Sequence, residues 1–113
     1  MVKRIVLVGA HTEPRDLTQS ALVAAGFEVD AHASGEAALE AMRAQAPDAL
    51  VTDFTLGALG GAELAARARV GGAGRRLFVV ALAEPGVAAP PSAFDEVLRK
   101  PVDLTELIAL LRS

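Results

Sequence analysis

The sequence predicts an α/β fold in which a five-stranded parallel sheet carries helices on both faces. Short apolar runs alternate along the chain with stretches that repeat apolar residues at helical spacing. Two of these runs, Ala49–Asp53 and Leu77–Leu82, are apolar or β-branched almost throughout, which is typical of strands buried on both faces. Because the chain has 113 residues, we expect a single domain over residues 1–113.

Composition and charge exclude several classes of protein. The chain has no cysteine, so neither a disulfide framework nor a zinc–thiolate site is available. Its net charge of −3 argues against a nucleic-acid-binding surface. No apolar run approaches the ~20 residues of a membrane helix, and Ile5–Ala10 is too short for the core of a signal peptide. We therefore expect a cytoplasmic protein without nucleic-acid or membrane partners.

The predicted elements follow one another with short connections. Strands are expected at Ile5–Val8, Phe27–His32, Ala49–Asp53, Leu77–Leu82 and Glu96–Arg99. Helices are expected after caps at Thr12, Ser34 and Asp103, the last forming a capping box with Glu106, and at Ala62–Val70. Gly26 should end the first helix in a left-handed conformation. Gly71–Gly74 is expected to be flexible.

A fourth helix is due between the last two strands, but the segment Ala83–Asp95 is unsuited to one. It contains Pro85, Pro90 and Pro91, and a proline costs ~3 kcal/mol inside a helix. We therefore expect this helix to be missing or short, with at best one turn near Ser92–Phe94.

A segment of small residues and prolines would leave the sheet partly uncovered beside it. Two outcomes are open: Phe94 folds inward as a plug, or a docking surface around Val87, Phe94 and Val97 receives a second copy of the chain or another protein. We favour the docking surface.

Asp53 is the main candidate functional residue. It ends a buried strand and precedes the loop-like run FTLGALGG. In parallel sheets, ligands and chemistry gather at the carboxyl ends of the strands. The alternative is that Asp53 merely caps the turn that follows it.

Several motifs of the chain together resemble the receiver domain of bacterial two-component response regulators. They are PDALVTD ending at Asp53, SGEAA from Ser34, Gly61 before the third helix, and Lys100–Pro101 after the last strand. The resemblance covers essentially the whole chain and implies a flavodoxin-like fold with strand order 2-1-3-4-5, which right-handed crossovers also favour. It implies that Asp53 is the phospho-acceptor position and that Lys100, Ala83 and Thr55 are supporting positions.

The departures from the family's pattern concern the metal site. Receivers place two acidic residues after the first strand, which hold Mg²⁺ beside the acceptor; here these positions are Gly9 and Ala10. Because Mg²⁺ is bound chiefly through carboxylate and phosphate oxygens, we expect it to bind weakly or not at all. His11 and Glu13, and also Glu84, are weak candidates to replace the missing ligands. The family's hydroxyl residue after the fourth strand is Ala83, and its aromatic residue on the fifth strand is Val97.

Three functions are weighed on this basis. The leading hypothesis is a pseudo-receiver, not an enzyme, that acts through contacts with a protein partner or as a homodimer, with Lys100 paired to Asp53. The alternative is a working receiver phosphorylated on Asp53 by a histidine kinase. A flavodoxin-like nucleotide-binding domain is less well supported, because the first βα turn, VGAHTE, contains neither G-x-G-x-x-G nor a P-loop.

Overall fold

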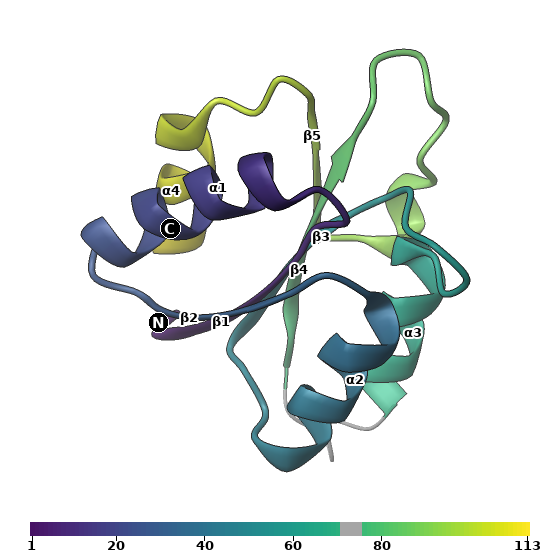
Figure 1. Cartoon of the computed structure of the whole chain (residues 1–113), viewed down its shortest axis with the longest axis horizontal. Coiled ribbons are helices and arrows are strands. Elements are labelled where there is room, and N and C mark those ends of the chain that lie inside the picture. Colours follow the sequence, from purple (N-terminus) through teal and green to yellow (C-terminus); the bar gives the residue numbers. More distant parts are fainter. Residues whose placement is uncertain (71–75) are drawn as a thin grey trace.

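A computed structural model of the chain, which describes residues 1–70 and 76–113, shows a five-stranded parallel sheet (Figure 1). Its strand order is β2-β1-β3-β4-β5. The strands are β1 Arg4–Val8, β2 Glu28–His32, β3 Ala49–Asp53, β4 Phe78–Ala83 and β5 Glu96–Arg99. The fold class and the strand order predicted from the sequence are confirmed. The predicted flexible segment Gly71–Gly74 lies outside the described residues.

Helices cover both faces of this sheet. They are α1 Thr12–Ala24, α2 Gly35–Ala44, α3 Gly61–Val70 and α4 Leu104–Arg112. Figure 1 shows α1 and α4 side by side on one face, and α2 and α3 together on the other. Between β4 and β5, where a further helix was due, the chain forms only the short 3-10 helix η1, Pro91–Ala93, in agreement with the prolines there. No helix in the described ranges is long and apolar enough to cross a membrane.

Two apolar cores lie on the two faces of the sheet, and the central strands contribute to both. Side chains alternate along a strand, so Ile5 and Leu7 of β1 pack in the core under α1 and α4, while Val6 and Val8 pack in the core under α2 and α3. All five side chains of β3 are buried. This explains why the central strands are apolar at every position rather than at every second one.

The helix caps were predicted correctly in two of three cases. The Ser34 hydroxyl accepts a backbone N–H of α2 at 3.2 Å, and the Asp103 carboxylate accepts two N–H groups of α4 at 3.0 and 3.2 Å. The prediction for Thr12 is wrong, because α1 begins one residue earlier: His11 is the cap residue, without a side-chain bond, and Thr12 is already helical. Gly26 has φ of 101°, the left-handed conformation expected after α1.

The segment between β4 and β5 closes over the sheet with an aromatic plug. Phe94 is 6% exposed and meets the ring of Phe54 edge to face, with centroids 6.0 Å apart and planes at 84°. The expectation that Phe94 belongs to an exposed docking surface is therefore wrong, since its ring fills the core beside α3 that small residues would leave open. Val87 and Val97 remain half-buried.

Polar contacts fasten this irregular segment at its two ends. The Arg99 guanidinium on β5 donates to the carbonyl oxygens of Glu84 and Val87. The Asp95 carboxylate accepts the backbone N–H of Val79 at 2.7 Å and pairs with Arg69 on α3 at 3.1 Å. Side chains of the neighbouring elements thus replace the internal hydrogen bonds that a helix would have supplied.

Replacing the plug should cost much of the stability of the domain. We expect Phe94→Ala to lower the free energy of unfolding by about 3–5 kcal/mol, because it removes a buried ring and leaves a cavity beside Phe54. Urea denaturation measures the loss. The control is Val23→Ala on α1, whose side chain is 52% exposed. This substitution should change the free energy of unfolding by no more than about 0.5 kcal/mol. Equal effects of the two substitutions would contradict the plug.

Candidate functional site

The candidate site lies at the carboxyl edge of the sheet, where Asp53 ends β3. Asp53 is 7% exposed and lies opposite Leu82 of β4 in the strand register. The chain then turns away from the sheet, held by a hydrogen bond from the Phe54 backbone N–H to the Leu82 carbonyl at 2.8 Å. The carboxylate is therefore fixed by a strand paired on both sides, with β1 and β4 as its neighbours.

An ion pair joins Asp53 to Lys100, as the sequence predicted. Lys100 Nζ lies 3.0 Å from Asp53 Oδ1 and 3.2 Å from Glu84 Oε1, so one ammonium serves two carboxylates. A backbone hydrogen bond from the Lys100 N–H to the Ala83 carbonyl, at 2.9 Å, holds the chain after β5 against the end of β4. Three strand ends thus contribute to one charged cluster.

The environment of Lys100 stabilises its charged form. Burial alone would lower the pKa of Lys100, but the hydrogen bond and the charge of Asp53, followed by those of Glu84, outweigh it and raise that pKa above 10.5. Lys100 is consequently an ammonium at neutral pH and a lasting counter-ion for Asp53.

Gly9 and Ala10 contact the carboxylate through the backbone rather than through side chains. The Ala10 N–H donates to Asp53 Oδ2 at 3.3 Å. A Cβ placed on Gly9 would lie 3.5 Å from Asp53 Oδ2 and 3.5 Å from the Arg15 side chain, which is ordinary van der Waals contact. The position therefore has room for a larger residue, although none is present.

The donor set around Asp53 does not fit a magnesium ion. Within the described residues there is no group of three or more His, Cys, Asp or Glu side chains that could hold a metal. His11 lines the same cavity as Asp53, whereas the exposed Glu13 borders a separate hollow on the outer side of α1. Glu84 is engaged with Lys100. The two carboxylates of the cluster, Asp53 and Glu84, are both paired with the Lys100 ammonium, which leaves few oxygen ligands for Mg²⁺.

The two remaining predicted positions differ in their relation to Asp53. Ala83 is 1% exposed at the end of β4, close to the cluster but without a hydroxyl. Thr55 is exposed in the loop after β3, and the structure does not bring it into the cluster. The nearby hydroxyl is that of Thr52, which the sequence did not single out; it is buried and donates to the Asp53 carbonyl at 3.0 Å.

Gly61 has a steric role beside the acceptor position. A Cβ at Gly61 would lie 2.5 Å from the Asp53 carbonyl oxygen and 3.0 Å from Phe54 Cα, distances at which the backbone would have to shift. The first turn of α3 can therefore approach the end of β3 only with glycine at this position.

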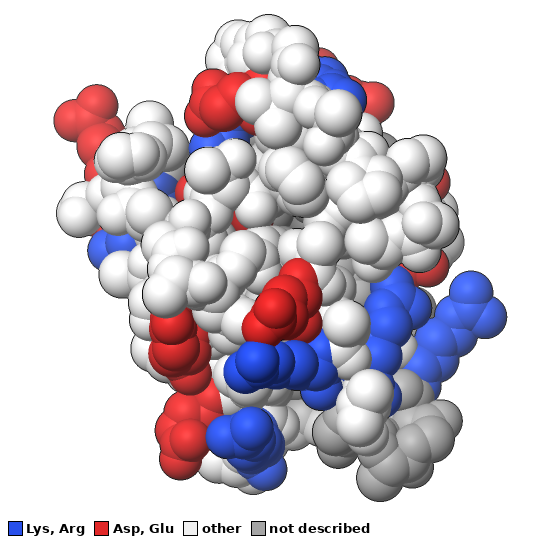
Figure 2. All heavy atoms as spheres, turned by 90° about the vertical axis from the view of Figure 1, so that its right-hand side faces the viewer, with Lys and Arg blue, Asp and Glu red and all other residues white. Residues whose placement is uncertain are grey.

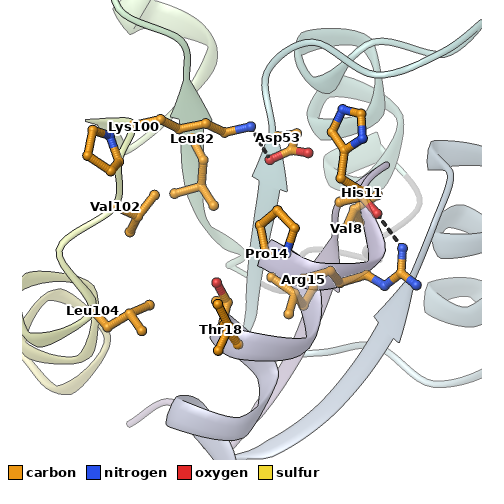
Figure 3. Close-up of a pocket in the computed structure, with 14 residues that line it drawn as sticks. Val8, His11, Pro14, Arg15, Thr18, Asp53, Leu82, Lys100, Val102 and Leu104 are labelled. Atoms are coloured by element: carbon orange, nitrogen blue, oxygen red, sulfur yellow. Dashed lines mark hydrogen bonds and ion pairs between the residues drawn. The ribbon is translucent and has the colours of Figure 1, made fainter.

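A cavity opens from the charged cluster between α1 and the connection from β5 to α4 (Figure 3). Its volume is about 260 Å³. Asp53 and Lys100 lie at one end, and Pro14 and Thr18 of α1 face Val102 and Leu104 across it. Sequence reasoning did not predict this cavity, because it arises from the spacing between two elements that are distant in the chain.

The fold and the edge cluster define a class: a doubly wound α/β domain with one carboxylate at the carboxyl edge of its central strand and a lysine paired to it. Comparison with known families agrees. The model of the response regulator receiver domain matches residues 5–112. The chain belongs to the response regulator receiver domain family.

Individual relatives are similar over nearly the whole chain. A 14.6 kDa protein from Leptolyngbya boryana, described only as uncharacterized and located in the sodA1 3′ region, is 33% identical over 96% of this chain and 86% of its own length. A CheY-like receiver domain from Methylobacillus flagellatus has a TM-score of 0.88 at 24% identity, covering 99% of this chain and 98% of its own. Chemotaxis protein CheY4 of Vibrio cholerae has a TM-score of 0.87 at 20% identity, covering 99% and 98%.

The ion pair can be tested by titrating Lys100. We expect Asp53→Asn to lower the pKa of Lys100, because burial remains while the largest stabilising partner loses its charge. The raised folded-state pKa means that the pair's stabilisation is fully present below pH 10.5 and is lost as pH rises through that pKa. NMR titration of the side-chain signals measures the shift. The chain has two lysines, so Lys3 supplies an internal reference. An equal pKa of Lys100 in the wild-type protein and in Asp53→Asn would contradict the ion pair between Lys100 and Asp53.

Proposed function

We propose that this receiver domain is a pseudo-receiver that acts through contacts with other proteins, without magnesium-dependent phosphorylation of Asp53. The surroundings of the Asp53 carboxylate are the main support. Its two oxygens meet the Lys100 ammonium and the Ala10 backbone N–H, and neither Gly9 nor Ala10 offers a carboxylate. On this proposal Mg²⁺ binds weakly or not at all, and the domain catalyses no reaction of its own.

Electrostatics supports the same proposal. Phosphoryl transfer depends on cations and hydrogen-bond donors that stabilise charge on the transferred group. Here the ammonium of Lys100 is shared between Asp53 and Glu84, so a phosphoryl group would add negative charge to a cluster that already has two carboxylates. The methyl group of Ala83 cannot donate a hydrogen bond. The carboxyl edge of the sheet therefore offers few of the cations and hydrogen-bond donors that phosphoryl transfer needs.

A face next to this edge suits the proposed protein contacts. Residues 54–62 and 85–94 contain no Lys, Arg, Asp or Glu, and their two segments meet through Phe54 and Phe94. Figure 2, which views the side of α3 and η1, shows a broad uncharged area, with charged side chains below it and at its upper margin. An uncharged surface is compatible with a protein partner or with a second copy of the chain. Val87, within residues 85–94, and Val97 on β5 are both half-buried.

One observation favours the alternative of a working receiver phosphorylated on Asp53 by a histidine kinase. The carboxylate lines an open cavity and keeps a lysine partner, so a phosphodonor has access to it. The same experiment decides between the two functions.

The deciding experiment is incubation of the protein with acetyl phosphate and Mg²⁺, followed by intact mass measurement. We expect no species heavier by one phosphoryl group, because the cluster offers too little positive charge to the transferred group. Asp53→Asn is the negative control. A phosphorylated species in the wild-type protein that is absent from Asp53→Asn would refute the pseudo-receiver and show that Asp53 is a working phospho-acceptor.

The double variant Gly9→Asp with Ala10→Asp is the matched positive control. Gly9 has room for a Cβ, and Ala10 is exposed, so neither backbone position excludes a side chain. We expect this variant to gain saturable Mg²⁺ binding and to be phosphorylated on Asp53. Without metal it should be less stable to thermal unfolding by at least about 1 kcal/mol, since three carboxylates would crowd one crevice. A variant more stable than the wild type without metal would show that these positions do not face Asp53.

A further inference from the structure

The uncharged segments 54–62 and 85–94 form one surface, which we call the neutral face. Half-buried side chains of both segments pack against the same apolar core, and they are Phe54, Leu56, Ala62, Ala89 and Ala93. The segments contain only two polar side chains, Thr55 and Ser92. Figure 2 shows the broad uncharged area on this side of the molecule. A large apolar surface is typical of a site that contacts another protein chain.

The acidic residues that border the neutral face all have cationic partners within the chain. Four acids directly precede or follow the two segments: Asp53, Glu63, Glu84 and Asp95. Their partners are Lys100, at 3.0 Å from Asp53 and 3.2 Å from Glu84, Arg67, at 2.6 Å from Glu63, and Arg69, at 3.1 Å from Asp95. A strongly charged partner protein therefore finds no unpaired carboxylate at these four positions to recognise.

Symmetry makes a second copy of the chain a suitable partner for this face. A contact about a two-fold axis brings each residue close to its own counterpart, so charged residues near the axis meet like charges. The net charge of −3 already works against association of two copies. An axis through the neutral face avoids the close like-charge contacts, because neither segment contains a charged residue.

The neutral face has the size and the stiffness of a weak dimer contact. Of its nineteen residues, all but Leu59, Gly61 and Phe94 are at least partly exposed. A specific interface takes roughly 20–30 residues from each partner, so the face lies slightly below that size. Three prolines stiffen the second segment, and the Arg99 guanidinium donates to backbone carbonyls at its start. A surface that is already ordered loses little conformational entropy on association.

We propose that the neutral face binds a second copy of this chain and forms a two-fold symmetric dimer. The inference rests on the proposed function in one respect, since it names the protein that the pseudo-receiver contacts. Asp53 and Glu84 directly precede the two segments, so the charged cluster of each copy lies beside the contact.

The dimer is tested by analytical ultracentrifugation of the full chain over roughly 5–500 μM. We expect the average mass to rise from that of one chain toward that of two, with the micromolar dissociation constant that a small interface allows. Because the contact is uncharged, raising the NaCl concentration from about 0.05 to about 0.5 M should change this constant by less than about threefold.

Three alanine-to-aspartate variants locate the contact. Ala58 and Ala88 are exposed, one in each segment, whereas Ala46 is exposed in the connection from α2 to β3, outside the neutral face. Ala58→Asp and Ala88→Asp should each weaken the dimer at least about tenfold, because the contact would desolvate an unpaired charge. Ala46→Asp is the matched control and should leave the dissociation constant unchanged. Urea denaturation of each variant confirms that it is folded.

The results separate this inference from the proposed function. A chain that stays monomeric over the whole concentration series would overturn the dimer. A dimer that persists in Ala58→Asp and Ala88→Asp, or that dissociates at high salt, would also overturn the inference, because the contact would then lie on another surface. A monomer that acetyl phosphate does not phosphorylate would keep the pseudo-receiver, with a different protein as its partner. A dimer that is phosphorylated on Asp53 would keep the contact and refute the pseudo-receiver.

Discussion

The burial of β3 on both faces and along both edges is the constraint on which the rest of the structure depends. All five of its side chains are buried, and it pairs with β1 on one side and β4 on the other. Asp53 is the last residue of this strand, so its side chain lies at the carboxyl edge of the sheet. Because the pairing is parallel, the ends of β1, β4 and β5 arrive at the same edge. Gly9, Ala83 and Lys100 are consequently brought to Asp53 by the sheet itself.

The sequence was sufficient for the fold because each of its signals is local and strong. The apolar runs that became β3 and β4 are β-branched or small at nearly every position, and the prolines between β4 and β5 exclude a helix there. The Asp53–Lys100 pair was also predictable, once the resemblance placed both residues at the same edge. The cap of α1 was predicted one residue late, since Thr12 and His11 are both plausible starts for a helix whose third residue is Pro14.

The errors concern features that depend on tertiary packing. Phe94 was expected at the surface, and the sequence alone could not show that Phe54 lies across from it at ring-contact distance. The resemblance made Thr55 a supporting position, but Thr55 is exposed in the loop after β3. The hydroxyl that donates to the Asp53 carbonyl belongs to Thr52. The cavity depends on the distance between α1 and the β5–α4 connection. The spacing of apolar residues in the sequence does not determine that distance. Local sequence patterns therefore predict helices and strands and where they end. The packing between them determines which side chains are buried and where a cavity remains.

The backbone at the amino end of α1 takes the place of the missing acids beside Asp53. The connection from β1 to α1 holds small residues, Gly9 and Ala10, whose backbone approaches Asp53 closely enough for a hydrogen bond. Neither residue brings a carboxylate to this point, and the charge of Asp53 is paired with the ammonium of Lys100 at 3.0 Å. The side toward α1 is left with spare acceptor capacity and apolar walls. The two residues that stand in place of the family's acid pair thus meet Asp53 through the backbone and leave its charge to be paired by Lys100.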